Sequence, residues 1–245
     1  MSSNIAFQGE LGAYGHQACA DARPNFSPLP CETFDDAIES VRKGDADLGM
    51  IAVENSTYGR VADVHSLLPE SGLHIVDEVF VRVHVNLLVK PGAQLAAIKT
   101  AYGHPVILPQ CAGFLRENLI TGRATSDNAR AAREVSEGDD LTVGALASEL
   151  AADIYGLDII ARHIEDADNN TTRFLVMARE PDYKKRGNHG MMTSFVFRVR
   201  NIPAALYKAM GGFATNGVNM IKLESYMVGG SFKATQFYAE IEGHP

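Results

Sequence analysis

Two clusters of polar residues stand next to apolar strands and carry side chains that can bind an anion or donate a proton. Residues 54–57, Glu-Asn-Ser-Thr, directly follow the continuous apolar run 48–53. Residues 169–173, Asn-Asn-Thr-Thr-Arg, lead directly into the apolar run 174–177. In open α/β sheets, ligands bind just beyond strand ends, where loop donors and helix N-termini converge. Both clusters are therefore candidates for a small-molecule site.

The first cluster allows two interpretations. Asn55 and Ser56 are good helix-capping residues, so capping alone could explain them. Glu54 favours a function, because a carboxylate would be an unneeded cost beside a simple cap.

The second cluster also has a functional and a structural interpretation. Arg173 offers planar, bidentate recognition of a carboxylate, and Asn170 and Thr172 can hydrogen-bond a hydroxyl or a second carboxylate. The alternative is a turn, since Asn and Thr commonly close turns. Spacing alone does not decide between the two.

A third cluster combines His104 with Gln110 and Cys111. A histidine that precedes a proline is more often a structural turn residue than a catalyst, and Cys111 is expected to be buried. The loop 9–15 carries three glycines but matches neither glycine motif of nucleotide-binding proteins. The three clusters together predict a small anionic ligand between two α/β lobes, with no metal ion, cofactor or covalent nucleophile.

The elements that must position these clusters alternate between strand and helix, which predicts a parallel or mixed sheet with helices on its faces. Thr33 and Asp36 form a capping-box pattern before the helix 34–43, which Gly44 should end. Ser126 is expected to cap a helix, and Gly156 to end another. The expected strands are 5–7, 48–53, 74–76, 79–89, 159–160 and 174–177, and the expected helices are 16–22, 34–43, 61–68, 126–136 and one that ends at 155.

The chain is expected to divide at a charged segment that has almost no apolar residues. Residues 1–180 should form one two-lobed domain, with the second lobe at 80–160. Residues 181–191 form the expected linker. Residues 192–245 predict a small β-α-β-β domain, most of a ferredoxin-like unit, which looks truncated at Pro245.

Composition excludes several classes of protein. The 22 Lys and Arg residues against 30 Asp and Glu give a net charge of -8, which argues against a nucleic-acid partner. Three widely spaced cysteines suggest neither a disulfide framework nor a zinc site. No segment resembles a signal peptide or a membrane span, so a cytoplasmic location with no membrane partner is expected.

The motifs resemble those of a known family. Residues 54–56 and the pattern Asn170-x-Thr172-Arg173-Phe174 resemble the two signature motifs of prephenate dehydratases. The segments 9–16 and 102–111 also resemble that family, in the correct order, so the resemblance covers residues 4–180. Residues 193–245 resemble the regulatory ACT domain that follows it.

The resemblance implies a catalytic region like type II periplasmic binding proteins, with prephenate in the cleft. The implied reaction is that of a carbon–oxygen lyase without a cofactor, the loss of CO2 and water to give phenylpyruvate for phenylalanine biosynthesis. The implied catalytic residues are Thr172, Asn55 and Gln110, and the implied substrate-binding residues are Glu54, Ser56, His104, Asn170, Arg173 and Phe174. Gly15 and Gly103 stand where the family commonly has Ser.

The ACT resemblance implies that L-phenylalanine is an allosteric effector. The positions that would bind it are Asn201, Ala204, Ala205, Leu206, Glu224 and Ser225. Ala204 replaces a common Gly, and Tyr226-Met227 stand where Arg-Pro is typical. A three-stranded fragment leaves a sheet edge and an apolar face to cover, so a homodimer or homotetramer is expected.

Two other functions remain open from the sequence. Arogenate differs from prephenate by an amino group in its side chain, and no single residue decides between an arogenate and a prephenate dehydratase. A non-catalytic amino-acid or solute-binding protein could use the same two-lobed fold, because fold does not fix function.

Overall fold

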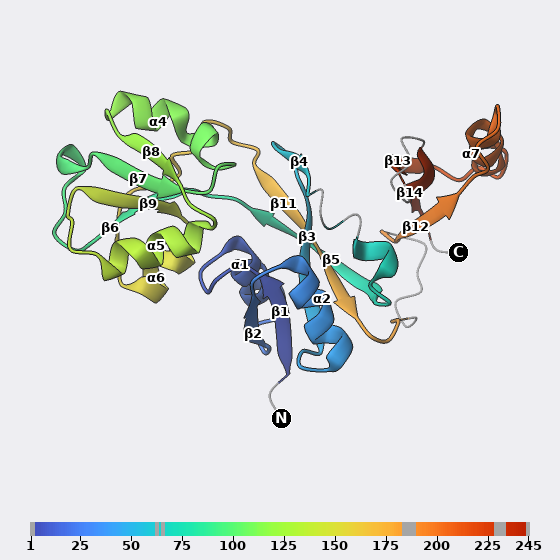
Figure 1. Cartoon of the computed structure of the whole chain (residues 1–245), viewed down its shortest axis with the longest axis horizontal. Helices are drawn as coiled ribbons and strands as arrows, with labels where there is room; N and C mark the ends of the chain where they lie inside the picture. Colours follow the sequence, from blue (N-terminus) through green and yellow to red (C-terminus); the bar gives the residue numbers. More distant parts are fainter. Residues whose placement is uncertain (1–2, 62–63, 65–66, 183–189, 228–233, 244–245) are drawn as a thin grey trace. The chain divides into compact units, whose positions relative to one another are not determined.

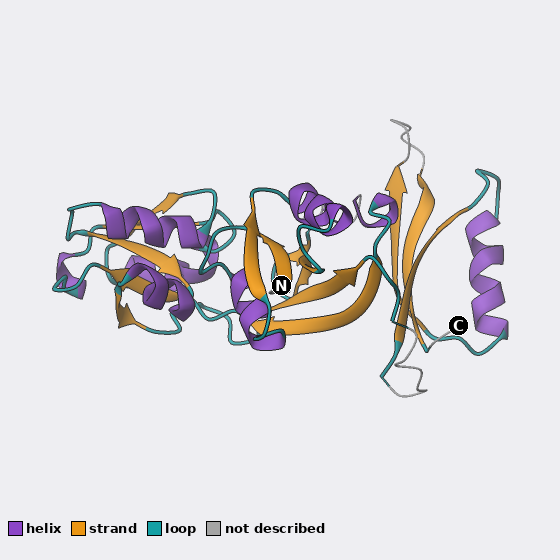
Figure 2. Cartoon of the chain, turned by 90° about the horizontal axis from the view of Figure 1, so that it is seen from below, coloured by secondary structure: helices purple, strands orange, loops and turns teal. Residues whose placement is uncertain are grey.

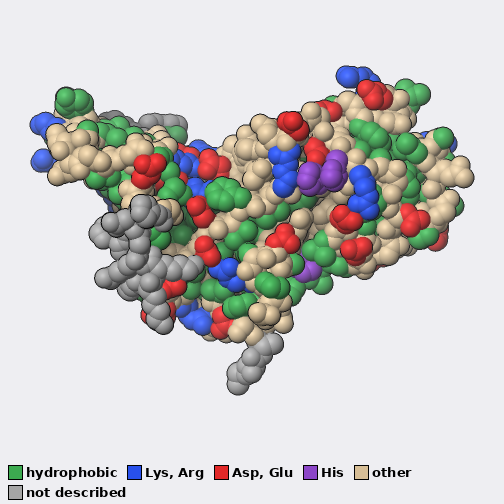
Figure 3. Space-filling view, turned by 180° about the vertical axis from the view of Figure 1, so that it is seen from behind, with side chains coloured by type: hydrophobic (Ala, Val, Ile, Leu, Met, Phe, Trp, Pro, Cys, Tyr) green, Lys and Arg blue, Asp and Glu red, His purple; other side chains and the backbone are tan. Residues whose placement is uncertain are grey.

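The computed structural model describes residues 3–61, 64, 67–182, 190–227 and 234–243. The chain forms two compact units, Met1–Pro181 and Asp182–Pro245, and each is described by itself. Within the described ranges, no helix is both long enough and apolar enough to cross a lipid bilayer. Figure 3 shows one face, on which the acidic and basic side chains of the described residues are interspersed.

The first lobe is a mixed sheet with the strand order β2-β1-β3-β11-β5, and β4 pairs with β3. The strands β1, β2 and β3 are parallel, whereas β11 is antiparallel to both β3 and β5. The elements are β1 (Asn4–Gln8), α1 (Tyr14–Ala22), β2 (Ser27–Cys31), α2 (Phe34–Lys43), β3 (Leu48–Asn55), β4 (Gly59–Arg60), η1 (Leu68–Glu70), β5 (His74–Arg82) and β11 (Thr171–Ala178).

The second lobe has the strand order β10-β6-β9-β7-β8. Here β7 is parallel to β8 and β9, and β6 is antiparallel to β9 and β10. The elements are β6 (Asn86–Val89), η2 (Leu95–Ala97), β7 (Thr100–Gly103), η3 (Leu108–Cys111), α4 (Ala112–Glu117), β8 (Thr121–Ala124), α5 (Asn128–Glu137), β9 (Val143–Ala147), α6 (Glu149–Tyr155) and β10 (Asp158–Ala161).

The two lobes repeat one pattern, which Figure 1 shows as two sheets. In the first sheet the parallel strands lie in the order β2-β1-β3, and β11, beside β3, is antiparallel to it. In the second sheet the parallel strands lie in the corresponding order β8-β7-β9, and β6, beside β9, is antiparallel to it. The chain passes between the lobes twice, at residues 83–85 and 162–170. The predicted two-lobed α/β fold is thus confirmed.

Apolar packing on both faces explains why the central strands of the first lobe form. Phe7, Met50 and Val176 belong to one buried cluster, and Ile51 and Met177 belong to another. Successive side chains of a strand point to opposite faces, so β1, β3 and β11 are covered on both sides. The continuous apolar runs 48–53 and 174–177 are therefore buried strands, as predicted.

Several expected boundaries are confirmed and two are wrong. Thr33 and Asp36 make the capping box of α2, and Gly44 and Gly156 end α2 and α6 in the left-handed conformation. Asp127, and not Ser126, caps α5, because the Asp127 carboxylate accepts hydrogen bonds from two N–H groups of its first turn.

The expected strand 79–89 is wrong as a single element. Residues up to Arg82 belong to β5 in the first sheet, and residues from Asn86 belong to β6 in the second. The expected helix 61–68 lies only partly within the described residues. Most of the expected linker, residues 183–189, lies outside them.

The second unit is a three-stranded antiparallel sheet with one helix, as the β-α-β-β prediction expects (Figure 2). Its strand order is β12-β14-β13, and the Phe195 ring packs against the Phe213 ring of the helix. The elements are β12 (Met192–Arg198), α7 (Ala205–Thr215), β13 (Met220–Met227) and β14 (Ala234–Glu242).

Candidate active site

The two polar clusters of the sequence meet at the pairing of β3 with β11. Thr172 stands directly opposite Asn55 in that antiparallel pair. The Asn55 Nδ2 amide donates to Asn170 Oδ1 at 2.7 Å and to Thr172 Oγ1 at 3.0 Å. Asn170 is buried, with 1% of its surface exposed, so these contacts are largely shielded from water. The structure therefore brings Asn55, Asn170 and Thr172 into one hydrogen-bonded group.

Gln110 joins this group from the second lobe. Asn170 Nδ2 donates to Gln110 Oε1 at 2.5 Å, and Gln110 Nε2 donates to the Val106 carbonyl at 2.7 Å. Gln110 lies in η3, whereas Asn55 ends β3 of the first lobe. We call the connected side chains of Asn55, Asn170, Gln110 and Thr172 the amide chain. It links the two lobes.

Backbone groups at both ends fix the direction of every hydrogen bond in the amide chain. The backbone N–H groups of Thr57 and Tyr58 both donate to Asn55 Oδ1 at 2.9 Å, so Asn55 must present its NH2 group to its neighbours. The Val106 carbonyl can only accept, so Gln110 must present its oxygen to Asn170. Thr172 Oγ1 accepts from Asn55, and its own O–H can therefore donate to an oxygen of a bound ligand.

Ser56 holds the two strands of the site together. Its hydroxyl donates to the Asn169 carbonyl at 2.7 Å and accepts from the Thr171 N–H at 2.9 Å. Its backbone N–H donates to the Thr171 carbonyl at 2.9 Å. The structure thus places Ser56 beside the second cluster, in a role that ties the end of β3 to the start of β11.

Arg173 and Glu54 belong to a different group from the amide chain. Because neighbouring residues of a strand point to opposite faces, Arg173 points away from the face of Thr172. Its Nε donates to Glu78 Oε2 at 2.8 Å, and its guanidinium lies 3.8 Å from Glu54 Oε2. The Arg173 side chain is only 10% exposed. We call these three residues the charged cluster.

Phe174 and His104 make contacts with residues outside the amide chain. Phe174 is 3% exposed and packs in the apolar core with Phe7 and Met50. His104 Nδ1 accepts from the Val106 N–H at 3.2 Å, and burial lowers the pKa of His104 below its usual value. A neutral His104 therefore stabilises the turn whose Val106 carbonyl anchors Gln110.

The two glycines that stand where Ser is common have close neighbours. A Cβ at Gly15 would lie 3.0 Å from the Phe7 ring, and a Cβ at Gly103 would lie 3.2 Å from Leu146 Cβ. A serine at either position would require these neighbours to move.

Sequence reasoning missed several residues around the site. Asn128 Oδ1 accepts from the His104 backbone N–H at 2.8 Å and so fixes the start of the turn that precedes η3. Burial raises the pKa of Asp127, the cap of α5. Glu10 contacts Arg130 and Arg133, whose three-residue spacing on one helix face could have indicated a shared carboxylate partner.

The residues expected to bind phenylalanine lie at one end of the second unit's sheet. Arg198 at the end of β12 and Tyr226 on β13 both pair with Gln236 of β14. Residues 201–206 follow β12 at that end, and residues 224–225 directly precede Tyr226. Ala204 precedes α7 with φ of 61°, a left-handed conformation that glycine adopts more easily.

Comparisons with known proteins identify the family of the chain. The family model described as prephenate dehydratase matches residues 5–182. A bifunctional N-acyl-homoserine lactone acylase/prephenate dehydratase of Komagataeibacter europaeus is 50% identical over 98% of this chain and 86% of that protein. Arogenate dehydratase/prephenate dehydratase 1 of Arabidopsis thaliana is 41% identical over 90% of this chain but only 56% of that protein.

The fold agrees with a solved structure as well. Prephenate dehydratase of Arthrobacter aurescens, solved in complex with L-Phe, has a TM-score of 0.90 and 27% identity, covering 98% of this chain and 80% of that chain. The family model spans nearly the whole first unit, which contains the amide chain. The chain belongs to the prephenate dehydratase family.

Proposed function

We propose that this chain catalyses the decarboxylating dehydration of prephenate to phenylpyruvate. The observation that carries the proposal is the fixed direction of the amide chain. It makes Thr172 Oγ1 an acceptor toward Asn55 and so turns the Thr172 O–H into a donor for the substrate. The dehydration needs such a donor at the oxygen that leaves.

The reaction requires little covalent chemistry from the protein. The electron pair of the breaking C–CO2 bond moves into the ring, and the hydroxyl group on the opposite ring carbon leaves, so the ring becomes aromatic. Thr172 would stabilise the negative charge that develops on the departing oxygen, and solvent would supply the proton that completes water. A preorganised donor of this kind acts mainly in the transition state.

The other site residues would hold the substrate and the donor in place. Asn55, Asn170 and Gln110 would fix the Thr172 hydroxyl, and Asn55 and Gln110 would also contact prephenate. Binding of a substrate carboxylate, which the sequence predicts for Arg173, is one of two roles open to this residue, and a structural role in the charged cluster is the other. In this structure its guanidinium already pairs with Glu78, which would have to yield to a substrate carboxylate.

We also propose that the second unit is an ACT domain that binds L-phenylalanine near residues 201–206 and 224–225 and assembles as a homodimer or homotetramer. Its strand order and the placement of both segments at one end of the sheet support this. The Arthrobacter aurescens relative was solved with L-Phe, which supports phenylalanine as the effector.

The test is steady-state turnover of prephenate and of arogenate, each with and without L-phenylalanine. The proposal expects phenylpyruvate from prephenate and a lower rate with L-phenylalanine. A faster conversion of arogenate to phenylalanine would identify an arogenate dehydratase instead. Tight binding of either compound without any turnover would indicate a solute-binding protein.

A second activity is favoured by one observation, the 50% identity to a bifunctional acylase/prephenate dehydratase. Hydrolysis of N-acyl-homoserine lactones would release a fatty acid and homoserine lactone. Incubation of the purified chain with such lactones, followed by chromatography of the products, tests this. Unchanged lactone after many dehydratase turnovers would exclude it.

A further inference from the structure

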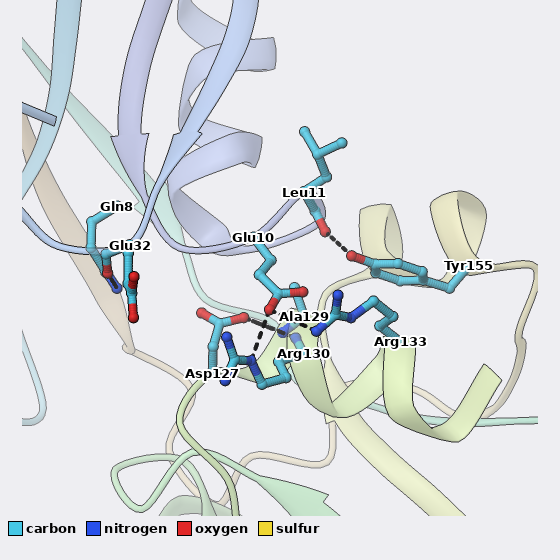
Figure 4. A network of polar contacts seen from close by, with 9 residues as sticks. All are labelled: Gln8, Glu10, Leu11, Glu32, Asp127, Ala129, Arg130, Arg133 and Tyr155. Carbon is cyan, nitrogen blue, oxygen red and sulfur yellow. Dashed lines mark hydrogen bonds and ion pairs between the residues drawn. The ribbon is translucent and has the colours of Figure 1, made fainter. Parts of the chain in front are cut away.

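The loop that follows β1, residues 9–13, is joined to the second lobe by an ion-pair cluster (Figure 4). Glu10 Oε1 accepts from Arg130 Nε at 2.8 Å and from Arg133 at 3.2 Å, and both arginines lie on α5. The side chains are 22% exposed for Glu10 and 42% exposed for each arginine. The pairs are therefore accessible to salt but not fully hydrated.

The backbone of the same loop is bound directly to the second lobe. Ser148 Oγ, which caps α6, donates to the Gly12 carbonyl at 2.6 Å, and Tyr155 OH donates to the Leu11 carbonyl at 2.8 Å. Gly12 has φ of +94°, and a Cβ there would lie 2.9 Å from the Cα of Ala151. Only a glycine permits this close approach of the two backbones.

The loop contacts and the amide chain both join the two lobes in the same structure. The loop 9–13 joins β1 to α1 in the first lobe and contacts α5 and α6 of the second. Asn170 contacts Gln110 of the second lobe as well. If the lobes separated, both sets of hydrogen bonds would be lost together. The loop contacts and the amide chain therefore belong to one closed arrangement.

We propose that Glu10 is a positioning residue, whose ion pairs with Arg130 and Arg133 hold the lobes closed so that Gln110 completes the amide chain. Glu10 then acts on the reaction through the fraction of molecules that are closed. The activity readout rests on the proposed dehydratase function, whereas the closure itself can be measured without substrate.

The variant Glu10→Gln removes the charge and keeps the shape. A lower closed fraction raises the apparent dissociation constant in proportion, and bound substrate restores closure. We expect KM for prephenate to rise by about three- to tenfold and kcat to stay within about twofold. The matched control is Glu149→Gln, because the Glu149–Arg162 pair at 2.9 Å joins α6 to the residue after β10 and does not involve the loop 9–13. Its KM should not change.

The dependence of KM on ionic strength gives a second readout. A merely structural role of Glu10 would not change it. Raising ionic strength from roughly 0.05 to 0.5 M shortens the screening length to a few ångströms. The ratio of KM between Glu10→Gln and wild type should therefore shrink toward one. The same ratio for Glu149→Gln should stay flat.

Hydrogen exchange without substrate tests the closure directly. We expect faster exchange in peptides spanning 9–13 and 148–155 in Glu10→Gln than in wild type. In Glu149→Gln, the peptide spanning 9–13 should exchange as in wild type. If Glu10→Gln does not fold, Arg133→Gln keeps the Arg130 pair and should show a smaller shift in the same direction. Unchanged exchange together with a KM within twofold of wild type would overturn the proposal. A wild type without dehydratase activity would refute the proposed function and leave the exchange test intact.

Discussion

Two neighbouring residues of β11, Thr172 and Arg173, lie in groups of opposite character. Thr172 belongs to the neutral amide chain, in which each hydrogen bond has a fixed direction. Arg173 belongs to the charged cluster, where the guanidinium contacts two carboxylates. The sheet separates the two groups, because successive side chains of a strand point to opposite faces.

The difference teaches how one strand can carry both chemistry and stability. In the charged cluster, one guanidinium contacts two carboxylates, and these ion pairs mainly stabilise the folded state. In the amide chain, donors and acceptors are matched so that the Thr172 O–H is left to donate to a ligand. Neutral groups bring no competing charge to a substrate with two carboxylates. Variants in each group test whether the two are as distinct as this.

The largest expected effect on stability is the loss in Arg173→Met. It removes the guanidinium that contacts Glu78 and Glu54 in a mostly buried place. Breaking a fully buried pair costs about 3–5 kcal/mol. Because the Glu78 and Glu54 side chains are 32% and 36% exposed, we expect about 2 kcal/mol. Urea unfolding measures this.

The control for Arg173→Met is Arg23→Met, which breaks the Arg23–Asp77 pair, where the side chains are 25% and 33% exposed. It should cost about 1 kcal/mol or less. The KM of Arg173→Met for prephenate should stay within about threefold of wild type. A KM raised more than about tenfold at unchanged stability would instead identify Arg173 as a substrate ligand. The charged cluster would then take part in substrate binding, as the amide chain is proposed to do.

The next effect is on turnover in Asn170→Asp. A carboxylate cannot donate to Gln110 Oε1. The Gln110 amide cannot flip to offer its NH2 group instead, because its oxygen would then face the Val106 carbonyl oxygen. We expect kcat to fall by about tenfold or more. Asn169→Asp, at an exposed neighbour, is the control and should keep its activity.

The pH dependence sharpens the Asn170→Asp prediction. Burial raises the pKa of a carboxyl group, and a protonated Asp can again donate to Gln110. The activity of this variant relative to wild type should therefore rise as the pH falls. A ratio that is independent of pH would show that the direction of the amide chain is unimportant.

The smallest expected effect is on the pH dependence of stability, through the neutral ring of His16, which can gain a charge. His16 Nδ1 accepts from the Gly12 N–H at 3.0 Å, and burial lowers the pKa of His16. The pKa of His16 in the folded state lies below the unfolded value of about 6.5. The neutral ring therefore stabilises the folded protein above pH 6.5, and this stabilisation is lost as the pH falls through the folded pKa. His16→Asn keeps an acceptor that does not titrate. Between pH 7.5 and 5, wild type should lose more stability than His16→Asn, by a few tenths of a kcal/mol after screening. Equal losses in urea unfolding would contradict this.

Much of the fold follows from local patterns in the sequence. Thr33, Asp36 and Gly44 define α2 through side-chain and backbone preferences that act within a few residues. The error at 79–89 has a physical cause. Val83 and Val85 are buried where the chain passes between the lobes, so hydrophobicity shows no break there.

The residue types of the candidate site could be predicted from the sequence. Which of these residues contact one another could not. The motifs pointed to Asn55, Asn170 and Thr172, yet their contact depends on the register of β3 with β11, more than a hundred residues apart in sequence. That Arg173 faces the opposite side follows from the same pairing. The Glu10 contacts to α5 depend on how the two lobes pack, which no local pattern encodes.

The most direct test of the account is the turnover of Thr172→Ala beside Thr172→Ser. If the Thr172 hydroxyl donates to the departing oxygen, the alanine variant should fold normally, lose about 10² or more in kcat, and keep KM nearly unchanged. The serine variant keeps the donor and should retain much of the activity. A folded Thr172→Ala protein that turns over prephenate within about threefold of wild type would show that the donor lies elsewhere.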